Sequence, residues 1–150
     1  MLEFVATDLH HERPAATDYY GVLLGLNCNF AIRLDHQVLF EEAEFPVLEF
    51  VEQLADWLAE SPEPSANFSY ESIESDVEDL VWIRWSDRGW RLGSAIRDSV
   101  AHNPFTLDEL RRALTELNDY LVALASRTLG LDVSDYITGE ARRRHQAGLH

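Results

Sequence analysis

Two stretches of the chain place apolar residues at helical spacing. Residues 46–60 begin with Pro46, which suits the first turn of a helix, and continue with an apolar stripe: Val47, Val51, Leu54 and Leu58. Residues 106–129 open with the capping-box motif TLDE, reach Gly130, and carry a leucine seam: Leu107, Leu110, Leu114, Leu117, Leu121 and Leu124. So short a seam favours a helix laid on a sheet over a coiled coil.

The other apolar runs have the short, β-branched and aromatic character of strands. They are EFVATDL near the start, YYGVLLGLNCNFAIRL and QVLFEEAEF between residues 19 and 45, NFSYESIES, and LVWIRWSDRGWRLGSAI. The tetrapeptides LDHQ and SDRG between such runs predict hairpin connections. Both faces of the last hairpin carry large apolar side chains, which predicts a central place in the sheet with one side under a helix.

This order of elements predicts an α+β fold in a single domain covering residues 1–150. We expect an antiparallel sheet of about five to seven strands, with helices 46–60 and 106–129 packed on one side. Residues 131–150 are expected to form a loosely attached tail or a short helix ending with Arg142–Arg144, whose role the sequence leaves open. The choice between monomer and homodimer is open as well.

Charge is distributed unevenly along the chain, whose formal net charge is -15. Residues 34–83 hold fourteen carboxylates and no Arg, whereas the rest holds thirteen carboxylates and all twelve Arg; Lys is absent. A strongly acidic surface can simply maintain solubility. It can also steer a basic protein partner, and it disfavours nucleic acid and anionic membranes as partners.

Searches for catalytic and metal-binding patterns find none. The HHE sequence at residues 10–12 lacks the second ligand pair of a zinc site, and ESIESDVED lacks the glycine of a calcium loop. No nucleophile elbow, phosphate-binding loop or dinucleotide motif occurs. We therefore expect a protein that is not an enzyme and has no cofactor or metal.

Cysteine and tryptophan positions have structural interpretations. The one cysteine, Cys28, lies among apolar residues, which predicts a buried free thiol. Trp82, Trp85 and Trp90 suit core filling or hairpin bracing better than a ligand platform. The N-terminus has no signal-peptide pattern, and no segment approaches the roughly 20 apolar residues of a membrane span, so we expect a cytoplasmic protein.

The segments VLFEEAEFPVLEFVEQLADWL, NFSYESIESDVEDLVWIRWSDRGWRLGSA and TLDELRRALTELNDYL carry a family resemblance over residues 38–124. They resemble small, acidic, uncharacterised α+β proteins of actinobacteria and bacilli. In size, charge and element order the chain is also similar to immunity proteins of bacterial polymorphic toxin systems. The resemblance implies binding and neutralising a cognate toxin, and it supplies no catalytic residue.

Our leading hypothesis is a non-enzymatic, immunity-like inhibitor that binds a toxin or another basic protein through an acidic surface. The expected contact residues come from the acidic side of helix 46–60 and from the segment that follows: Glu49, Glu52, Asp56, Glu60, Glu71, Glu74, Asp76, Glu78 and Asp79. The alternative is a small-ligand or metal-binding module that uses the Trp-rich hairpin and adjacent carboxylates.

Overall fold

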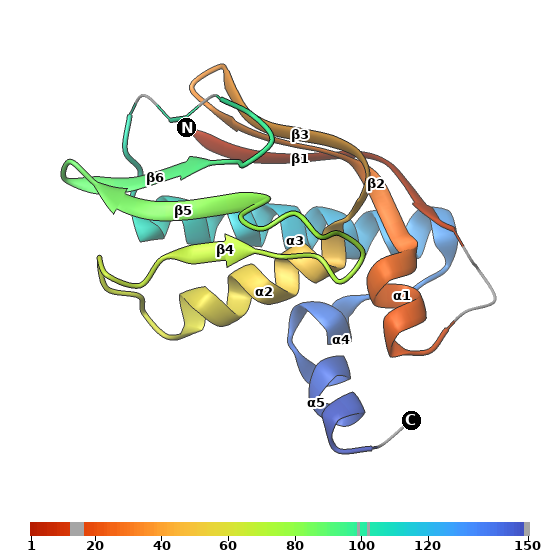
Figure 1. Cartoon of the computed structure of the whole chain (residues 1–150). Helices are drawn as coiled ribbons and strands as arrows, with labels where there is room; N and C mark the ends of the chain where they lie inside the picture. The colour runs from red at the N-terminus through yellow and green to blue at the C-terminus, as the bar shows by residue number, and fades with distance from the viewer. Residues whose placement is uncertain (13–16, 99, 102, 149–150) are drawn as a thin grey trace.

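The computed structural model describes residues 1–12, 17–98, 100–101 and 103–148. Within them, two antiparallel three-stranded sheets pack with the two long helices, and the shorter helices lie at one end of the molecule (Figure 1). The first sheet has the order β1 (Leu2–His11), β2 (Leu26–Leu34), β3 (Gln37–Pro46), and the second has β4 (Phe68–Tyr70), β5 (Val81–Ser86), β6 (Gly89–Gly93). The helices are α1 (Tyr19–Gly25), α2 (Val47–Ala59), α3 (Leu107–Leu129), α4 (Ser134–Ile137) and α5 (Glu140–Gln146).

The α+β class is confirmed, but the expectation of one sheet with five to seven strands is wrong. Helix α2 follows β3 directly and carries the chain away from the first sheet before β4 begins. Side chains link β3 to the segment that follows β6: Gln37 Nε2 donates to the Val100 carbonyl at 2.8 Å, and Arg97 Nε donates to the Val38 carbonyl at 3.2 Å. Strand periodicity does not encode which strands pair, so the division was invisible in the sequence.

Residues 19–25 correct a second expectation, because they form helix α1 rather than the start of a strand. Tyr19, Val22, Leu23 and Leu26 have the i, i+3, i+4, i+7 spacing of one helical face, and the last three are buried. The aromatic and β-branched residues of this segment suggested a strand, but burial of that face outweighs their intrinsic preference.

Both predicted hairpins are confirmed. Asp35 and His36 connect β2 to β3 with φ values of 48° and 73°, and Asp87 and Arg88 connect β5 to β6 with φ values of 50° and 77°. Two consecutive left-handed residues give a turn whose twist matches that of the strands it joins. The hairpin was expected to lie centrally in the sheet, but only β5 does so, because β6 is an edge strand of the second sheet.

The two long helices lie within one residue of their predicted ends. Thr106 caps α3: its Oγ1 accepts a hydrogen bond from the Glu109 amide at 3.1 Å, and Glu109 Oε2 accepts one from the Thr106 amide at 3.0 Å. Gly130 closes the helix in the left-handed conformation, with φ at 61°. The buried part of the leucine seam faces the core: Leu110, Leu114, Leu117 and Leu121.

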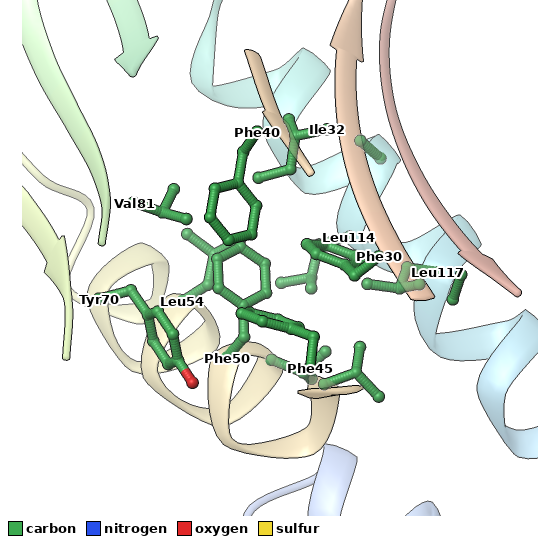
Figure 2. Packing of buried hydrophobic residues seen from close by; sticks show 14 of the residues in the cluster. Phe30, Ile32, Phe40, Phe45, Phe50, Leu54, Tyr70, Val81, Leu114 and Leu117 are labelled. Atoms are coloured by element: carbon green, nitrogen blue, oxygen red, sulfur yellow. The ribbon is translucent and has the colours of Figure 1, made fainter. Parts of the chain in front are cut away.

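An aromatic core lies where α2 and α3 meet the inner face of the first sheet (Figure 2). Phe30 and Phe45 stack with ring centroids 4.8 Å apart, and the edge of Phe50 meets Tyr70 at 5.5 Å. The same cluster includes Val81 of β5, so both sheets share it. Cys28 is fully buried, and burial raises the pKa of its thiol to about 12, as suits the predicted free thiol.

Candidate protein-binding surface

Glu49 is not on the surface, although the sequence placed it on the exposed side of α2. Its side chain is buried, and its two oxygens accept hydrogen bonds from the Tyr70 hydroxyl at 2.6 Å and the Ile73 amide at 3.0 Å. Buried carboxylates persist only when they are hydrogen-bonded in this way. Glu49 is therefore a structural anchor, and a partner does not reach it in this conformation.

Two other acids of α2 are paired inside the chain. Arg142 of α5 makes a two-pronged ion pair with Asp56, its Nη2 lying 2.8 Å from Oδ1, and its Nη1 lies 4.0 Å from Glu52 Oε1. The Tyr19 hydroxyl lies 2.7 Å from both Glu52 oxygens. Burial raises the pKa of Glu52, and the Tyr19 hydrogen bond and the Arg142 charge oppose that rise. Glu60, just after α2, is exposed.

The segment between β4 and β5, residues 71–79, forms what we call the acidic loop. Gln53 holds its start, donating from Nε2 to the Glu71 carbonyl at 2.9 Å and accepting from the Glu71 amide at 3.3 Å. Glu49 holds the Ile73 amide, and at the far end the Asp79 carbonyl accepts from the Ala95 amide at 3.0 Å. The loop backbone is thus fixed by α2 at one end and by the segment after β6 at the other.

Two apolar side chains of this loop point to solvent. Ile73 is 67% exposed and Val77 is 38% exposed, the only hydrophobic side chains of the acidic loop. Four exposed carboxylates accompany them: Glu71, Glu74, Asp76 and Glu78. The last predicted acid, Asp79, pairs instead with Arg84 of β5 at 3.2 Å. The acidic loop therefore presents two exposed apolar side chains and four exposed carboxylates in one short segment.

A hollow of about 330 Å³ lies where the acidic loop approaches α1. Its lining includes Glu74 from the loop and Glu12, Asp18 and Tyr20 from the chain around α1. Tyr20 is 45% exposed, so an aromatic ring and three carboxylates border the same depression. Such a lining suits a cationic side chain, which carboxylates and aromatic faces both attract.

The tryptophans divide between core and surface. Trp90 is buried and meets Trp57 edge to face, with ring centroids 5.2 Å apart. Trp82 covers Gly93 across the hairpin, and the Arg84 guanidinium lies 4.4 Å from the centroid of the Trp82 ring. These two fill the core and brace the hairpin, as predicted. Trp85 is 43% exposed and lines a hollow of about 300 Å³ beside the start of α3.

Histidines near the N-terminus are used in structural contacts. His10 bonds the Asp8 carbonyl through Nδ1 at 2.8 Å and Glu44 through Nε2 at 2.9 Å, and these contacts raise its pKa. His11 Nε2 lies 3.2 Å from the Gly21 carbonyl. Across the residues with described positions, no group of three or more His, Cys, Asp or Glu side chains could hold a metal ion. In the same residues no helix has the length and apolar character needed to cross a membrane.

One protein family matches most of the chain. Its model, a domain of unknown function (DUF7878), covers residues 2–125. The chain belongs to the DUF7878 family. No curated protein and no solved structure matches this chain. The DUF7878 match contains both sheets and the acidic loop and ends within α3, so α4 and α5 follow the matched residues.

Sequence reasoning missed the apolar and aromatic members of this surface. Ile73 and Val77 stood in a segment chosen for its charge, and Tyr20 was assigned to a strand. One signal was present: two isolated apolar residues in a polar stretch without strand or helix periodicity. The pairing of Arg142 with Asp56, by contrast, left no local signal, because 86 positions separate the two residues.

Proposed function

We propose that this protein is a non-enzymatic binding protein, an immunity-like inhibitor that captures a basic protein partner, such as a cognate toxin, in the cytoplasm. The acidic loop and the adjoining hollow beside α1 form the contact surface. Its apolar centre is Ile73, and its charged rim consists of Glu71, Glu74, Asp76 and Glu78. Of the other acids expected from sequence, Glu49, Glu52, Asp56 and Asp79 have partners within the chain.

The observation that carries the proposal is that Ile73 is exposed while its own backbone is held by a buried side chain. A freely moving loop loses conformational entropy when it binds, whereas a loop fixed beforehand does not. Binding energy in protein interfaces concentrates in a few central side chains surrounded by a polar rim. An exposed isoleucine on a fixed backbone, in a segment with four exposed carboxylates, offers both kinds of group before any partner arrives.

The negative rim contributes mainly to the speed and selectivity of association. Opposite charges on two surfaces steer diffusional encounter, and the gain falls as salt screens them, over about 8 Å at physiological ionic strength. The net charge of -15 gives the whole molecule a long-range field of one sign. A basic partner would therefore associate quickly at low salt. Burial of Ile73 in the complex would then slow its dissociation.

Where a toxin-like reading frame adjoins the gene, the test titrates the encoded protein with this chain by calorimetry and follows the association rate by stopped-flow fluorescence. We expect Ile73→Ala and the pair Glu74→Arg with Asp76→Arg each to weaken binding by about tenfold or more. The charge-reversed pair should also reduce the salt dependence of the association rate, whereas Ile73→Ala should leave that dependence unchanged. Asp119→Arg on the exposed side of α3 is the matched control and should leave affinity within about twofold.

Unchanged affinity in both loop variants would exclude the acidic loop as the contact surface. A separate thermal-shift screen addresses the small-ligand alternative at the Trp85 hollow. A compound that stabilises the wild type but not Trp85→Ala would favour that alternative, since a ligand stabilises only the state that binds it.

A further inference from the structure

Residues 131–148, which we call the C-terminal arm, fold into α4 and α5 and pack against α1 and α2 (Figure 1). Val133 and Ala141 are buried against the rest of the protein. The arm follows the residues that the DUF7878 family model matches. The arm lies outside the matched residues and covers part of their surface.

Arg142 is the charged contact between the arm and α2. It pairs with Asp56 through both terminal nitrogens and lies 4.0 Å from Glu52, so one cation faces two carboxylates. The side chain of Arg142 is 28% exposed and that of Glu52 is 11% exposed. The Asp56 side chain is 50% exposed, so the bidentate geometry, and not burial, distinguishes this contact from an ordinary surface ion pair.

An aromatic contact holds the arm to α1. His145 stacks on Tyr19 with ring centroids 4.6 Å apart and an angle of 14°, and its ring meets Tyr20 edge-on at 5.0 Å. Tyr19 in turn contacts Glu52, so the aromatic and charged contacts adjoin. We call the surface formed by Tyr19, Tyr20, Glu52 and Asp56 the arm groove.

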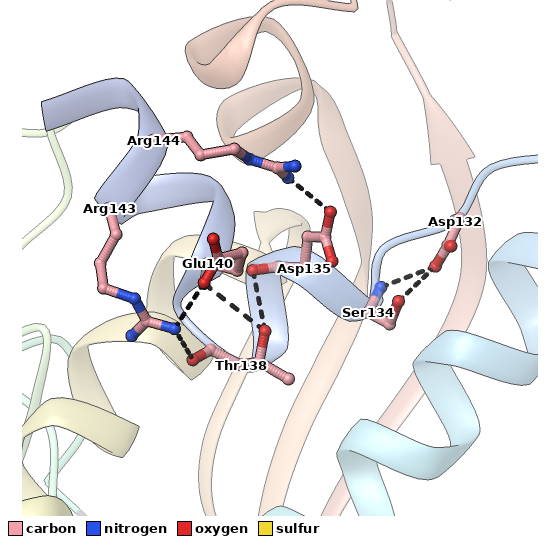
Figure 3. A network of polar contacts seen from close by, with 7 residues as sticks. All are labelled: Asp132, Ser134, Asp135, Thr138, Glu140, Arg143 and Arg144. Carbon is pink, nitrogen blue, oxygen red and sulfur yellow. Dashed lines mark hydrogen bonds and ion pairs between the residues drawn. The ribbon is translucent and has the colours of Figure 1, made fainter. Parts of the chain in front are cut away.

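The other two arginines of the arm form ion pairs with carboxylates of the arm (Figure 3). Arg143 pairs with Glu140 at 2.9 Å, and Arg144 pairs with Asp135. Asp132 accepts hydrogen bonds from the Ser134 amide at 3.0 Å and from its hydroxyl at 2.6 Å, which fixes the start of α4. The arm is thus braced internally and directs Arg142 toward α2.

The fit between arm and groove is incomplete. A hollow of about 230 Å³ remains between α2 and the arm, lined by Ala55 and Ala59 on one side and Ile137 and Gly139 on the other. Arg142 Nε is buried but has no hydrogen-bond acceptor. Helices of 4 and 7 residues have little stability of their own in water. Val133 belongs to the hydrophobic core, whereas α5 contributes only Ala141 to the buried residues, so α5 depends on its contacts with α1 and α2, which another helix of similar chemistry could replace.

We propose that the arm groove is a docking site for a short arginine-bearing helix of a partner protein, and that the C-terminal arm occupies it until the partner displaces it. The inference deepens the proposed function and rests on it for the existence of a basic partner. A tethered segment competes at an effective concentration of roughly millimolar, so it lowers the apparent affinity of any free helix for the same groove. Weakening the arm should consequently strengthen binding of a helix added in solution.

The experiment uses the full chain and a fluorescent synthetic peptide with the sequence of residues 131–148 as the probe, followed by anisotropy. We expect Arg142→Ala in the chain to raise its affinity for the probe by about tenfold over wild type, because the tethered competitor is weakened. Arg143→Ala, which removes an arginine paired within the arm, is the matched control and should bind the probe as wild type does. A probe carrying Arg142→Ala should not bind.

Two further measurements decide which groups the groove recognises. Adding Asp56→Ala to the Arg142→Ala chain should abolish probe binding while circular dichroism and the thermal midpoint show a folded protein. An unlabelled alanine-rich helical peptide with one arginine and a histidine three residues later should compete with the probe, because the groove contacts both an arginine and an aromatic ring.

Several outcomes would overturn the proposal. The proposal is wrong if the folded Arg142→Ala chain binds the probe no better than wild type, or if the alanine-rich peptide does not compete. Dimers of the Arg142→Ala chain in size-exclusion chromatography, with no probe binding, would assign the groove to the arm of a second copy. Because this experiment involves neither the acidic loop nor the neighbouring gene product, its result is independent of the test of the proposed function.

Discussion

The Tyr70 hydroxyl donates a hydrogen bond of 2.6 Å to the Glu49 carboxylate in the interior of the protein. The other Glu49 oxygen accepts from the Ile73 amide, so one buried carboxylate joins α2, β4 and the acidic loop. Burial raises the pKa of the Tyr70 hydroxyl, and the hydrogen bond to Glu49 acts in the same direction. The position of the exposed Ile73 therefore depends on a contact that lies below the surface.

Removing the Glu49 carboxylate should loosen the acidic loop. Glu49→Ala leaves the Tyr70 hydroxyl and the Ile73 amide without their partner, a loss of about 1–3 kcal/mol for the buried hydroxyl and less for the part-buried amide. We expect amide hydrogen exchange across residues 71–79 to accelerate by about tenfold or more. Glu60→Ala, at an exposed position just after the same helix, is the control and should leave exchange in the acidic loop unchanged.

Phe50 should be among the most costly core positions to truncate. Its ring is fully buried and contacts five others: Phe4, Phe30, Phe45, Phe68 and Tyr70. Phe50→Ala is expected to lower the free energy of unfolding by about 3–5 kcal/mol in urea titration, from lost burial and the cavity left behind. Ile96→Ala, at a side chain 52% exposed, should change it by less than about 0.5 kcal/mol.

Replacing the half-buried Glu42 by neutral Gln should stabilise the protein to an extent that depends on pH. Burial raises the pKa of Glu42 above its ordinary value, so the folded protein disfavours its charged form. An acid with a raised folded pKa imposes no cost below its unfolded pKa, and the cost develops as the pH rises through the folded pKa. Glu42→Gln should therefore have a higher thermal midpoint than wild type at about pH 7 and the same midpoint at about pH 3. Glu41→Gln, at an exposed neighbour, should show no such pH-dependent difference.

Loss of the N-terminal cap of α3 should destabilise the protein. The capping-box motif in the sequence already indicated this contribution. Thr106→Ala removes the side-chain acceptor of the Glu109 amide and should destabilise the protein by about 1 kcal/mol, measured as a lower urea midpoint with an unchanged slope. Thr115→Ala in the exposed middle of α3 is the matched control, and it should be neutral or slightly stabilising because alanine favours the helix. Equal losses for both variants would contradict a capping role.

Much of the fold was predictable because its signals are local. The capping box with Gly130 and the leucine seam gave the ends of α3, and Pro46 with its apolar stripe gave α2. The two hairpin turns followed from short polar connections. Helix α1 was missed although its apolar residues have helical spacing, because their β-type character was given more weight than their period.

The candidate surface was predictable only in outline. Charge counting found the acidic loop, but it could not separate Glu74, at the surface, from Glu49, in the interior. Whether a carboxylate is exposed depends on which segment packs over it. For Glu49 that segment is β4 with the acidic loop, and for Asp56 it is the C-terminal arm.

The sequence by itself determined the α+β class, the two long helices, the hairpins and the concentration of negative charge in residues 34–83. These properties arise from residues close together in the chain, where spacing and capping act directly. Only the tertiary structure decided that the strands form two sheets, that Glu49 is buried, and that Arg142 faces Asp56. Each of these depends on contacts between segments far apart in the sequence, and local patterns carry no record of which distant segments will meet.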